Sequence, residues 1–485
     1  MDRRSFLKAT SAVWGGSLLR RSSEPLGFDT KNSSSDATNS GSGGSKSVIV
    51  VGGGIGGLTT GYELMKRGHE VTVLEATGEP GGHVRTLEDG LADGLYADIG
   101  AEHFTQPGYE IYRELVDELG LTKLEYPRRE NQLFLREEGK FYKSRTDRST
   151  SALKARGLNS REIQFLQEHP GQGLRALYFE PYLGEFEDEY QPLGIGLDPL
   201  DTVSVTELLK REGASSAGIE MAGGSGSALQ ALWHDAILRL RGVPRVPTKL
   251  WRLKGGNQKL PLALAEELGR RVRLGCRVTG IEHGRSGATV TYEEFGERKT
   301  KEAGYVVISM PLPMVGRLEV EPSWSPAKQY VIENTTYYTA TVFVMQSRTR
   351  FWEEDGTSPN LVFNRPELGS CRAMAGEVET PRGLIVGDAQ GGTDPEETLE
   401  TFRHFYPGSR ENVEHIQAKS WSTDRWAPFC ERLSFGLGEL DKFWPEVMKP
   451  EGRIHFASSS TDNLAWGMEA ATRSARRVAS DIDRA

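Results

Sequence analysis

Apolar residues near the beginning of the chain follow the pattern of a parallel βαβ unit. Residues 47–51 form a continuous, β-branched apolar run, which is typical of a strand buried on both faces. A glycine-rich segment follows at residues 52–57, residues 58–67 are compatible with a helix, and residues 70–74 form a second apolar strand. This succession predicts a strand, a tight turn, a helix and a strand, and therefore an α/β fold with a parallel sheet.

The glycine-rich segment matches the pattern G-x-G-x-x-G, and each of its three glycines has a separate task. Gly52 permits a tight turn, Gly54 lets the backbone approach a pyrophosphate, and Gly57 lets helix and strand pack closely. Phosphate charge then lies at the positive end of the helix. Glu75, directly after the second strand, is placed to accept hydrogen bonds from ribose hydroxyls. We therefore predict a dinucleotide site; a structural βαβ turn is the alternative. The expected contacts are Gly52, Gly54, Ile55, Gly56, Gly57 and Glu75.

A second helical pattern, near the C-terminus, also points to a ligand. Apolar residues follow Gly467 at Ala471, Ala475, Val478 and Ile482, so one face of a helix is expected to be buried. The first residues of this helix would aim free backbone N–H groups and a partial positive charge at a bound molecule. A plain packing helix is the alternative.

Composition limits the classes of protein to consider. The 485 residues carry 59 basic and 68 acidic side chains, a net charge of −9, which argues against a dedicated nucleic-acid binder. No run of about 18 apolar residues occurs, so we expect no stable membrane span. Three scattered cysteines predict neither a disulfide framework nor a zinc site, and no metal is expected. The 56 glycines are an excess, as expected for a glycine-rich soluble enzyme whose backbone approaches a ligand.

The first residues resemble a twin-arginine export signal. Paired arginines at residues 3–4 are followed by Phe-Leu-Lys at residues 6–8 and by a short, weakly apolar stretch at residues 9–19. The twin-arginine export machinery carries folded proteins, so we expect a periplasmic or secreted enzyme that takes up its cofactor before export. A chance arginine pair is the alternative. Residues 22–45 are rich in Ser, Gly, Asn and Asp, which predicts a flexible linker.

Several sequence blocks, in order, resemble the flavin amine oxidase family, which includes polyamine and amino-acid oxidases. They lie at residues 75–86, 96–104, 254–257, 276–281, 306–311 and 455–471. The resemblance implies FAD as the cofactor, a diglycine motif near its phosphates, a Gly-Ala turn beside the isoalloxazine ring, and backbone contacts with the adenine. The residues implied in this way are Gly82, His83, Arg85, Gly100, Ala101, Glu102, Val278, Ser459, Trp466, Gly467 and Met468.

The same blocks predict an α/β protein with a Rossmann-like FAD-binding domain of the GR2 type and an interleaved α+β substrate domain. The FAD-binding domain would be assembled from residues 46–130, 245–325 and 425–485. The substrate domain would be formed by residues 131–244 and 326–424, and the signal and linker would occupy residues 1–45.

The chain departs from the family pattern at three positions near the cofactor. His83 replaces the arginine that usually follows the diglycine and contacts phosphate, although Arg85 stands two residues later. Residues 458–459, both serine, replace a Gly-Glu pair whose carboxylate helps to hold the cofactor. The strand before residues 351–352 lacks the lysine that usually holds a water near flavin N5, and Thr341 is the best match for its position. The missing lysine leaves room for a dehydrogenase with another electron acceptor.

The resemblance also implies an aromatic cage around the substrate amine, and this cage is altered here. Aligning Trp421 with the family tryptophan puts Glu431 where one cage tyrosine usually stands. Phe429, Trp426 and Trp466 are aromatic residues that would rebuild a cage, although isolated aromatic residues more often belong to a core. The catalytic candidates are therefore Trp421, Trp466, Phe429, Glu431 and Thr341.

One cysteine matches a further feature of the family. The spacing from Trp421 to Cys430 equals that of monoamine oxidases whose cysteine binds the flavin covalently. A thiolate at Cys430 would attach to the flavin 8α carbon. The alternative is a buried structural thiol, which we expect because proline and phenylalanine precede the cysteine where the family has glycine.

The resemblance implies an enzyme that oxidises the C–N bond of a primary amine or polyamine. Hydride transfer to flavin N5, imine hydrolysis and reoxidation by O2 or a periplasmic acceptor would complete the reaction. Glu102 and the acidic stretch at residues 180–189 would attract a cationic substrate. For residues 180–189, the alternative is a solvated acidic loop. Glu102 and His103 stand where amino-acid oxidases usually have an arginine, which disfavours amino acids.

Three alternatives remain open at this point. The first is a C–C desaturase or porphyrinogen oxidase on the same scaffold, and the second is a flavin-binding protein without oxidase turnover. The third is a nicotinamide-dependent dehydrogenase. The sequence predicts no oligomeric state.

Overall fold

A parallel sheet of five described strands lies at the centre of the nucleotide-binding part, in the order β10-β2-β1-β14-β23. The structure is a computed structural model that describes residues 44–127, 133–135, 141–143, 149–169, 172–245, 249–354, 356–432, 434–463 and 467–485. The strands are β1 (Ser47–Val51), β2 (Glu70–Leu74), β10 (Val272–Arg273), β14 (Tyr305–Ile308) and β23 (Ile454–Phe456). Each neighbouring pair runs parallel. The two strands predicted from the apolar runs are thus confirmed, within one sheet drawn from distant parts of the chain.

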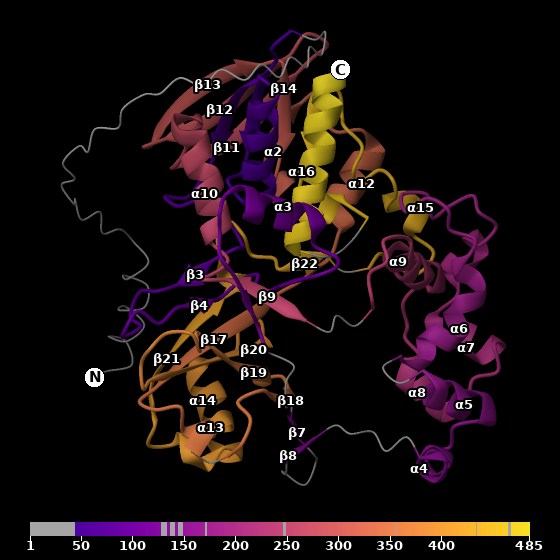
Figure 1. Ribbon diagram of the computed structural model, residues 1–485. Helices are drawn as coiled ribbons and strands as arrows, with labels where there is room; N and C mark the ends of the chain where they lie inside the picture. The colour runs from indigo at the N-terminus through magenta and orange to yellow at the C-terminus, as the bar shows by residue number, and fades with distance from the viewer. Residues whose placement is uncertain are drawn as a thin grey trace, which may run out of the picture. The chain divides into compact units, whose positions relative to one another are not determined.

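Residues of β1 point alternately into two cores, which is why this strand is apolar throughout. Val48 and Val50 pack in a core cluster with the helices α2 (Ile55–Lys66), α10 (Lys259–Leu268) and α16 (Gly467–Arg484). Ile49 and Val51 belong to a second cluster, which includes residues of the neighbouring antiparallel sheet. Figure 1 shows α10, α2 and α16 side by side, and α2 contacts both of the other helices.

Both predicted helices are confirmed, with one shift. The first begins at Ile55 rather than at residue 58, because the glycines of the turn already take part in it. In α16 the predicted apolar residues Ala471, Ala475, Val478 and Ile482 are all buried. Next to α16 lies α3 (Glu110–Glu118).

An antiparallel sheet extends the nucleotide-binding part, in the order β13-β12-β11-β15. It consists of β11 (Cys276–His283), β12 (Ala288–Glu294), β13 (Glu297–Ala303) and β15 (Glu319–Glu321), the last of which pairs parallel with β11. The backbone N–H of Cys276 donates to the carbonyl oxygen of Glu75 at 2.7 Å. This bond joins β11 to the end of β2, so the two predicted nucleotide segments meet.

A second sheet of seven described strands has the order β21-β17-β20-β19-β18-β7-β8. The strands are β7 (Leu133–Leu135), β8 (Phe141–Lys143), β17 (Ala340–Ser347), β18 (Leu361–Arg365), β19 (Leu368–Met374), β20 (Gly383–Gln390) and β21 (Val413–Ser420). Side chains from α13 (Phe351–Glu354) and α14 (Pro395–Phe405) share its core cluster. Smaller sheets join β3 (Thr86–Leu87) to β4 (Ala97–Asp98), β9 (Leu250–Leu253) to β5 (Phe104–Thr105) and β6 (Lys123–Glu125), and β16 (Tyr337–Tyr338) to β22 (Glu431–Arg432).

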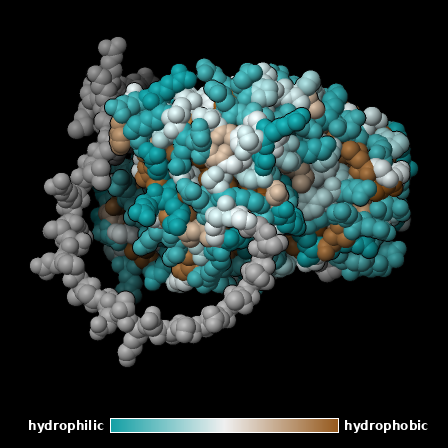
Figure 2. Space-filling model, turned by 90° about the horizontal axis from the view of Figure 1, so that it is seen from above, coloured by the Kyte–Doolittle hydropathy of each residue, from teal (hydrophilic) through white to brown (hydrophobic). Residues whose placement is uncertain are grey.

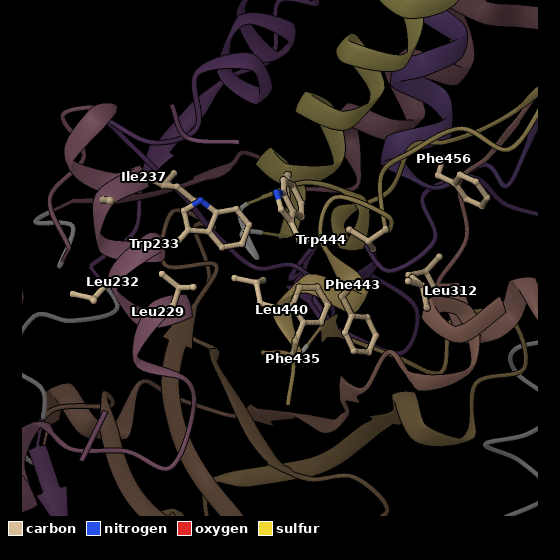
Figure 3. Packing of buried hydrophobic residues seen from close by; sticks show 14 of the residues in the cluster. Leu229, Leu232, Trp233, Ile237, Leu312, Phe435, Leu440, Phe443, Trp444 and Phe456 are labelled. Carbon is tan, nitrogen blue, oxygen red and sulfur yellow. The ribbon is translucent and has the colours of Figure 1, made fainter. Parts of the chain in front are cut away.

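The remaining helices include a group from the middle of the chain: α4 (Thr150–Ala155), α5 (Ser160–Glu168), α6 (Leu174–Leu183), α7 (Val205–Arg211), α8 (Ser216–Ala222) and α9 (Ala228–Leu240). The others are α11 (Leu312–Val315), α12 (Pro326–Asn334) and α15 (Leu440–Phe443). Figure 3 shows how α9 joins the C-terminal segment: the Trp233 and Trp444 ring centroids lie 4.8 Å apart, and Phe435 stacks on Phe443 at 4.4 Å. The Trp233–Trp444 contact thus joins α9 to the C-terminal segment, in which Phe435 and Phe443 stack on each other.

The face drawn in Figure 2 is mostly hydrophilic, with hydrophobic residues in small separate groups. Among the described helices, none is long and apolar enough to cross a bilayer. Residues 1–43, which carry the predicted export signal and most of the linker, lie outside the described residues. The proposed domain boundaries stay a prediction, although segments from residues 133–143 and 337–420 do share one sheet.

Candidate functional site

The glycine-rich turn between β1 and α2 is shaped so tightly that side chains are excluded at its ends. Gly52 has a φ of +106°, and a Cβ there would lie 2.7 Å from the Ser309 carbonyl oxygen. A Cβ at Gly57 would overlap the carbonyl oxygen of Gly52. Gly54, in contrast, has no protein atom within 4 Å of the place where a Cβ would stand. Open space therefore faces the middle glycine, as a closely approaching ligand requires.

The first turn of α2 is left free to bind an anion. Gly54 is the N-cap residue and offers no side-chain hydrogen bond, and the first turn contains no acidic residue. The backbone N–H groups of Ile55 and Gly56 thus have no capping side chain, and the positive end of the helix faces the open space. This arrangement fits the pyrophosphate of a dinucleotide.

Glu75 is held in a fixed position at the end of β2. One of its carboxylate oxygens accepts a hydrogen bond from the Gly53 backbone N–H at 2.6 Å, and the other accepts from the N–H and the hydroxyl of Thr77, both at 2.8 Å. The side chain is buried, and the remaining acceptor capacity of the carboxylate fits a ribose hydroxyl. Val278 lies on β11, whose first residue, Cys276, is hydrogen-bonded to Glu75. The residue predicted to contact the adenine therefore belongs to the strand that meets the residue predicted to bind the ribose.

The diglycine and the Gly-Ala turn pack directly on the nucleotide turn. Gly81 pairs with Gly54 in an isolated parallel bridge, and a Cβ at Gly82 would lie 3.2 Å from the Gly54 Cα. The Ala101 N–H donates to the His83 carbonyl oxygen at 3.2 Å, which a side chain at Gly100 would overlap. These predicted cofactor residues, although far apart in sequence, therefore form one continuous backbone surface.

Asn257 and Asp98 hold this surface together and were not among the predicted site residues. Asn257 donates its side-chain amide to the Ala101 carbonyl oxygen at 3.0 Å, and its backbone N–H donates to the Asp98 carboxylate at 2.8 Å. Burial raises the pKa of Asp98 to about 7. Asn257 belongs to the block at residues 254–257, which matches the family pattern. The sequence does not reveal, however, that this asparagine contacts Ala101 and Asp98.

His83 lies against Trp421 rather than forming an ion pair. Their ring centroids are 4.0 Å apart, and the His83 Nε2 is buried without a hydrogen-bond partner in the described structure. Burial lowers the pKa of His83 to about 4, so the imidazole is neutral at pH 7. Arg85 forms an ion pair with Glu79. The phosphate contact expected of Arg85 stays a prediction.

The depressed pKa of His83 predicts a dependence of stability on pH. The unfolded chain, with a pKa near 6.5, binds this proton more readily than the folded protein, whose value is about 4. The stability contributed by neutral His83 is therefore complete above about pH 6.5 and is lost as the pH falls toward 4. We expect His83→Gln to reduce the loss of unfolding free energy between pH 7 and 4 by roughly 2–3 kcal/mol. Urea unfolding at several pH values measures this, and parallel curves for the two proteins would contradict it.

Trp421, at the start of the 3-10 turn η4 (Trp421–Thr423), is fully enclosed. Its indole Nε1 donates to the Ile99 carbonyl oxygen at 2.7 Å, next to the Gly-Ala turn. Thr341 is also buried, and its hydroxyl is bonded to Ser420 at 3.2 Å and accepts from the Gly392 N–H at 3.0 Å. Both candidates thus hold neighbouring segments in place.

A lysine is nevertheless present on the next strand. Lys419 of β21 pairs in register with Val342 of β17, so its side chain leaves the sheet on the face opposite to that of Thr341, which pairs with Ser420. Its Nζ lies 4.9 Å from the centre of the Trp421 ring and 2.5 Å from the Asp424 carboxylate. Lys419 is not among the residues predicted from the sequence, because the pairing of β21 with β17 is not visible in the sequence.

The predicted aromatic cage stays a prediction. Phe429 packs on Tyr337, with ring centroids 4.9 Å apart, whereas Glu431 is exposed and its carboxylate oxygen lies 3.6 Å from where a Gly467 Cβ would stand. Trp466 lies outside the described residues. Burial raises the pKa of the Cys430 thiol to about 11, so this thiol is protonated at pH 7 and is a poor nucleophile.

An ionic cluster that the sequence did not reveal follows the Gly-Ala turn. The buried guanidinium of Arg372, on β19, pairs with Glu102 and also with the Asp388 carboxylate of β20 at 2.6 Å. His103 Nδ1 lies 3.3 Å from the second oxygen of Glu102. Two carboxylates thus surround one guanidinium. The acidic stretch at residues 180–189 does not join this cluster, since Glu180 and Glu189 pair with arginines of α9 and its C-terminal end.

The C-terminal residues complete the backbone surface. Ser459 begins the 3-10 turn η5 (Ser459–Thr461), which follows β23 and contacts α16. Gly467 starts α16, and Met468 beside it is buried. A Cβ at Gly56 would lie 2.8 Å from the carbonyl oxygen of Ala457, so the C-terminal segment packs directly on the nucleotide turn. The residues present therefore fit a dinucleotide with a further ring system near the start of α16.

Comparisons with known proteins agree with this geometry. The family model described as flavin containing amine oxidoreductase matches residues 55–483. An L-amino acid oxidase of Bothriechis schlegelii is 26% identical over 91% of this chain and 90% of its own length, and one of Lachesis muta is 29% identical over 91% and 87%.

Two groups of solved structures share the fold. Putrescine oxidase, solved with putrescine bound, has a TM-score of 0.73 at 22% identity, covering 91% of this chain and 99% of that one. Cyclohexylamine oxidase from Brevibacterium oxydans has a TM-score of 0.70 at 20% identity, with coverage of 91% and 99%.

Proposed function

Because the chain belongs to the flavin-containing amine oxidoreductase family, we propose that it oxidises the C–N bond of a primary amine or polyamine rather than of an amino acid. The family assigns it as an FAD-dependent oxidoreductase that acts on CH–NH2 donors. When bound, FAD supplies the two-electron acceptor for this chemistry. The chain itself contributes the anion-binding end of α2, the carboxylate of Glu75 and the start of α16.

One observation carries the preference for an amine: the Glu102–Arg372–Asp388 cluster beside the Gly-Ala turn. The Arg372 guanidinium is already paired with two carboxylates, so the cluster is negative on balance. A substrate carboxylate would have to compete with both acids for one buried cation, whereas a substrate ammonium group is attracted. The cluster therefore supports a cationic substrate.

Oxidation of an L-amino acid is the second candidate. The curated relatives at 26–29% identity are L-amino acid oxidases, and the match extends over nine-tenths of the chain. This reaction needs a cation that is available to the substrate carboxylate, and the guanidinium that pairs with Glu102, next to the Gly-Ala turn, is engaged.

Anaerobic bleaching of the flavin absorbance distinguishes the candidates. The purified holoenzyme is mixed with butylamine, putrescine, spermidine and benzylamine, and separately with L-leucine, L-phenylalanine and a porphyrinogen. We expect at least one amine to bleach the flavin and the amino acids to leave it oxidised. Bleaching by an amino acid alone would establish the second candidate. Bleaching by the porphyrinogen alone would favour C–C oxidation, and no bleaching at all would favour a binding protein.

We further propose that the enzyme is exported in folded form by the twin-arginine route. Support comes from Arg3-Arg4 and the short apolar stretch that follows. In a bacterial host with this machinery, the wild-type chain is expected in the periplasmic fraction. Replacement of both arginines by lysine is expected to leave it in the cytoplasm, and equal periplasmic amounts of both would contradict the proposal.

A further inference from the structure

Glu189 and Tyr190 connect the helical group, α4 to α9, to the segment that precedes α16. They lie in a loop of residues 184–197, which follows α6 and forms no helix or strand although all of it is described. Glu189 is the last residue of the acidic stretch that the sequence analysis singled out. The other acidic residues of this stretch are exposed, whereas Glu189 and Tyr190 are partly buried. The end of the stretch is therefore held against the protein.

Two indole N–H groups fix the backbone of this loop. Trp233 of α9 donates to the carbonyl oxygen of Glu189 at 2.8 Å, and Trp444 donates to that of Tyr190 at 2.9 Å. Figure 3 shows these two indole rings next to each other. The Tyr190 ring also stacks on the Trp444 ring, with centroids 6.3 Å apart. The backbone and the ring of Tyr190 are thus held without any help from its hydroxyl group.

The Tyr190 hydroxyl instead joins two charged groups outside the helical group. It donates to Asp462 Oδ1 at 3.0 Å and accepts from Arg473 Nη2 at 2.6 Å. Arg473 Nε in turn donates to Asp462 Oδ2 at 2.8 Å. Asp462 follows η5, and Arg473 belongs to α16. The helical group, the segment after η5 and α16 therefore meet at this one phenol.

Asp462 depends on these donors because its side chain is fully buried, and that of Arg473 is only 13% exposed. The third donor to the carboxylate is the backbone N–H of Asn463 at 2.8 Å. The side-chain amide of Asn463 donates back to the loop, to the Glu189 carbonyl oxygen at 2.9 Å. A buried carboxylate that loses a donor is costly unless the segment moves to replace it. Loss of the Tyr190 hydroxyl would therefore favour a displacement of the segment.

The displaced segment would include part of the cofactor surface. Residues 457–463 follow β23, and the carbonyl oxygen of Ala457 lies 2.8 Å from where a Gly56 Cβ would stand, in the first turn of α2. Residues 455–471 are also the block that resembles the flavin-ring motif of the family. One end of the segment thus packs on the nucleotide turn, and Tyr190 holds the other.

We infer that Tyr190 is a positioning residue for FAD: through Asp462 and Arg473, its hydroxyl keeps residues 457–463 in place beside the cofactor. The inference uses only the FAD that this family binds and holds whichever amine or amino acid is oxidised. It gives the loop of the helical group a part in cofactor binding, although 272 positions separate Tyr190 from Asp462.

Release of FAD from the holoenzyme tests the inference without turnover. Tyr190→Phe removes the hydroxyl and keeps the ring on Trp444. We expect FAD to leave this variant about threefold to tenfold faster than the wild type, part of the effect of one charge-assisted hydrogen bond. Flavin fluorescence after dilution of the holoenzyme measures the rate. The visible circular dichroism of the bound flavin should also change, because it reports the surroundings of the ring.

Tyr182→Phe is the matched control. The Tyr182 hydroxyl also donates to a carboxylate, that of Glu212 at 2.5 Å, but this bond lies within the helical group. Thermal unfolding should show that this variant is less stable than the wild type. Its rate of FAD release and its flavin circular dichroism should nevertheless equal those of the wild type, which a general loosening of the helical group would not allow.

A double-mutant cycle shows whether Tyr190 acts through Asp462. In the Asp462→Asn background, Tyr190→Phe should accelerate FAD release by a smaller factor than in the wild type. Should Tyr190→Phe fail to fold, Glu189→Gln replaces it, because it removes the loop carboxylate that lies 3.4 Å from Arg473. Its effect is expected in the same direction but smaller, since this contact is longer than that of the phenol.

Three results would overturn the inference. The first is a folded Tyr190→Phe holoenzyme, or a folded Glu189→Gln holoenzyme in its place, that releases FAD at the wild-type rate. The second is equal acceleration in Tyr182→Phe, which would trace the effect to the stability of the helical group. The third is full additivity in the cycle, which would mean that the hydroxyl does not act through Asp462.

Discussion

Gly54→Ala is expected to leave the polypeptide folded and to remove most of its bound FAD. The variant adds a methyl group where no protein atom lies within 4 Å, and the Gly54 backbone, with φ −71° and ψ 174°, suits alanine. The methyl group would, however, occupy the space through which the pyrophosphate approaches the first turn of α2. We expect the dissociation constant for FAD to rise at least about tenfold, or roughly 1.4 kcal/mol.

Two matched variants define what this result means. Gly173 is the N-cap residue of α6, also with open space around the position of a Cβ, so Gly173→Ala should keep wild-type FAD content. Gly57→Ala places its methyl group on the Gly52 carbonyl oxygen and should fold poorly or not at all. Far-ultraviolet circular dichroism reports folding, and flavin fluorescence during reconstitution reports affinity. A folded Gly54→Ala protein with wild-type affinity would show that the cofactor does not approach this turn.

The sequence was most informative where structure depends on neighbouring residues. A buried parallel strand must be apolar on both faces, and a turn that allows no side chain must be glycine, so β1 and the turn at Gly52 were visible in one short segment. The same holds for α16, whose buried residues follow the helical period. These elements fix the nucleotide end of the site.

The sequence was least informative where distant segments meet. Arg372 and Glu102 are separated by 270 positions, and neither has a local pattern that signals a partner. Lys419 meets Val342, the neighbour of Thr341 in the chain, only through the pairing of β21 with β17. The ion pair of Arg85 with Glu79 likewise could not be predicted from the motif that contains Arg85. Each of these contacts is decided by packing between strands or loops, which a single sequence does not record.

Arg372→Met is expected to destabilise the protein by about 3–5 kcal/mol, because it removes the cation that balances a buried carboxylate. Arg372 and Glu102 are 7% and 8% exposed in their side chains, so water cannot replace the lost guanidinium at Glu102. Methionine has a similar length and fills much of the same volume, which keeps the loss of packing small. Urea unfolding of the variant and the wild type measures the difference in free energy.

A second arginine provides the control, since Arg382 also bridges two carboxylates. It pairs with Asp93 at 2.7 Å and with Glu414 at 3.1 Å, but its side chain is 32% exposed, and that of Asp93 is 40% exposed. Surface pairs of this kind contribute about 1 kcal/mol or less, so Arg382→Met should change stability little.

The double variant Arg372→Met/Glu102→Gln then identifies the cause of the loss. If the unbalanced charge of Glu102 destabilises Arg372→Met, its removal should recover a substantial part of the lost free energy. Equal losses in the Arg372 and Arg382 variants, or no recovery in the double variant, would mean that the cluster serves packing rather than charge balance. Recovery of stability would show that the unbalanced charge of Glu102, and not lost packing, destabilises Arg372→Met, because the double variant keeps the methionine and removes one charge of each sign from the cluster.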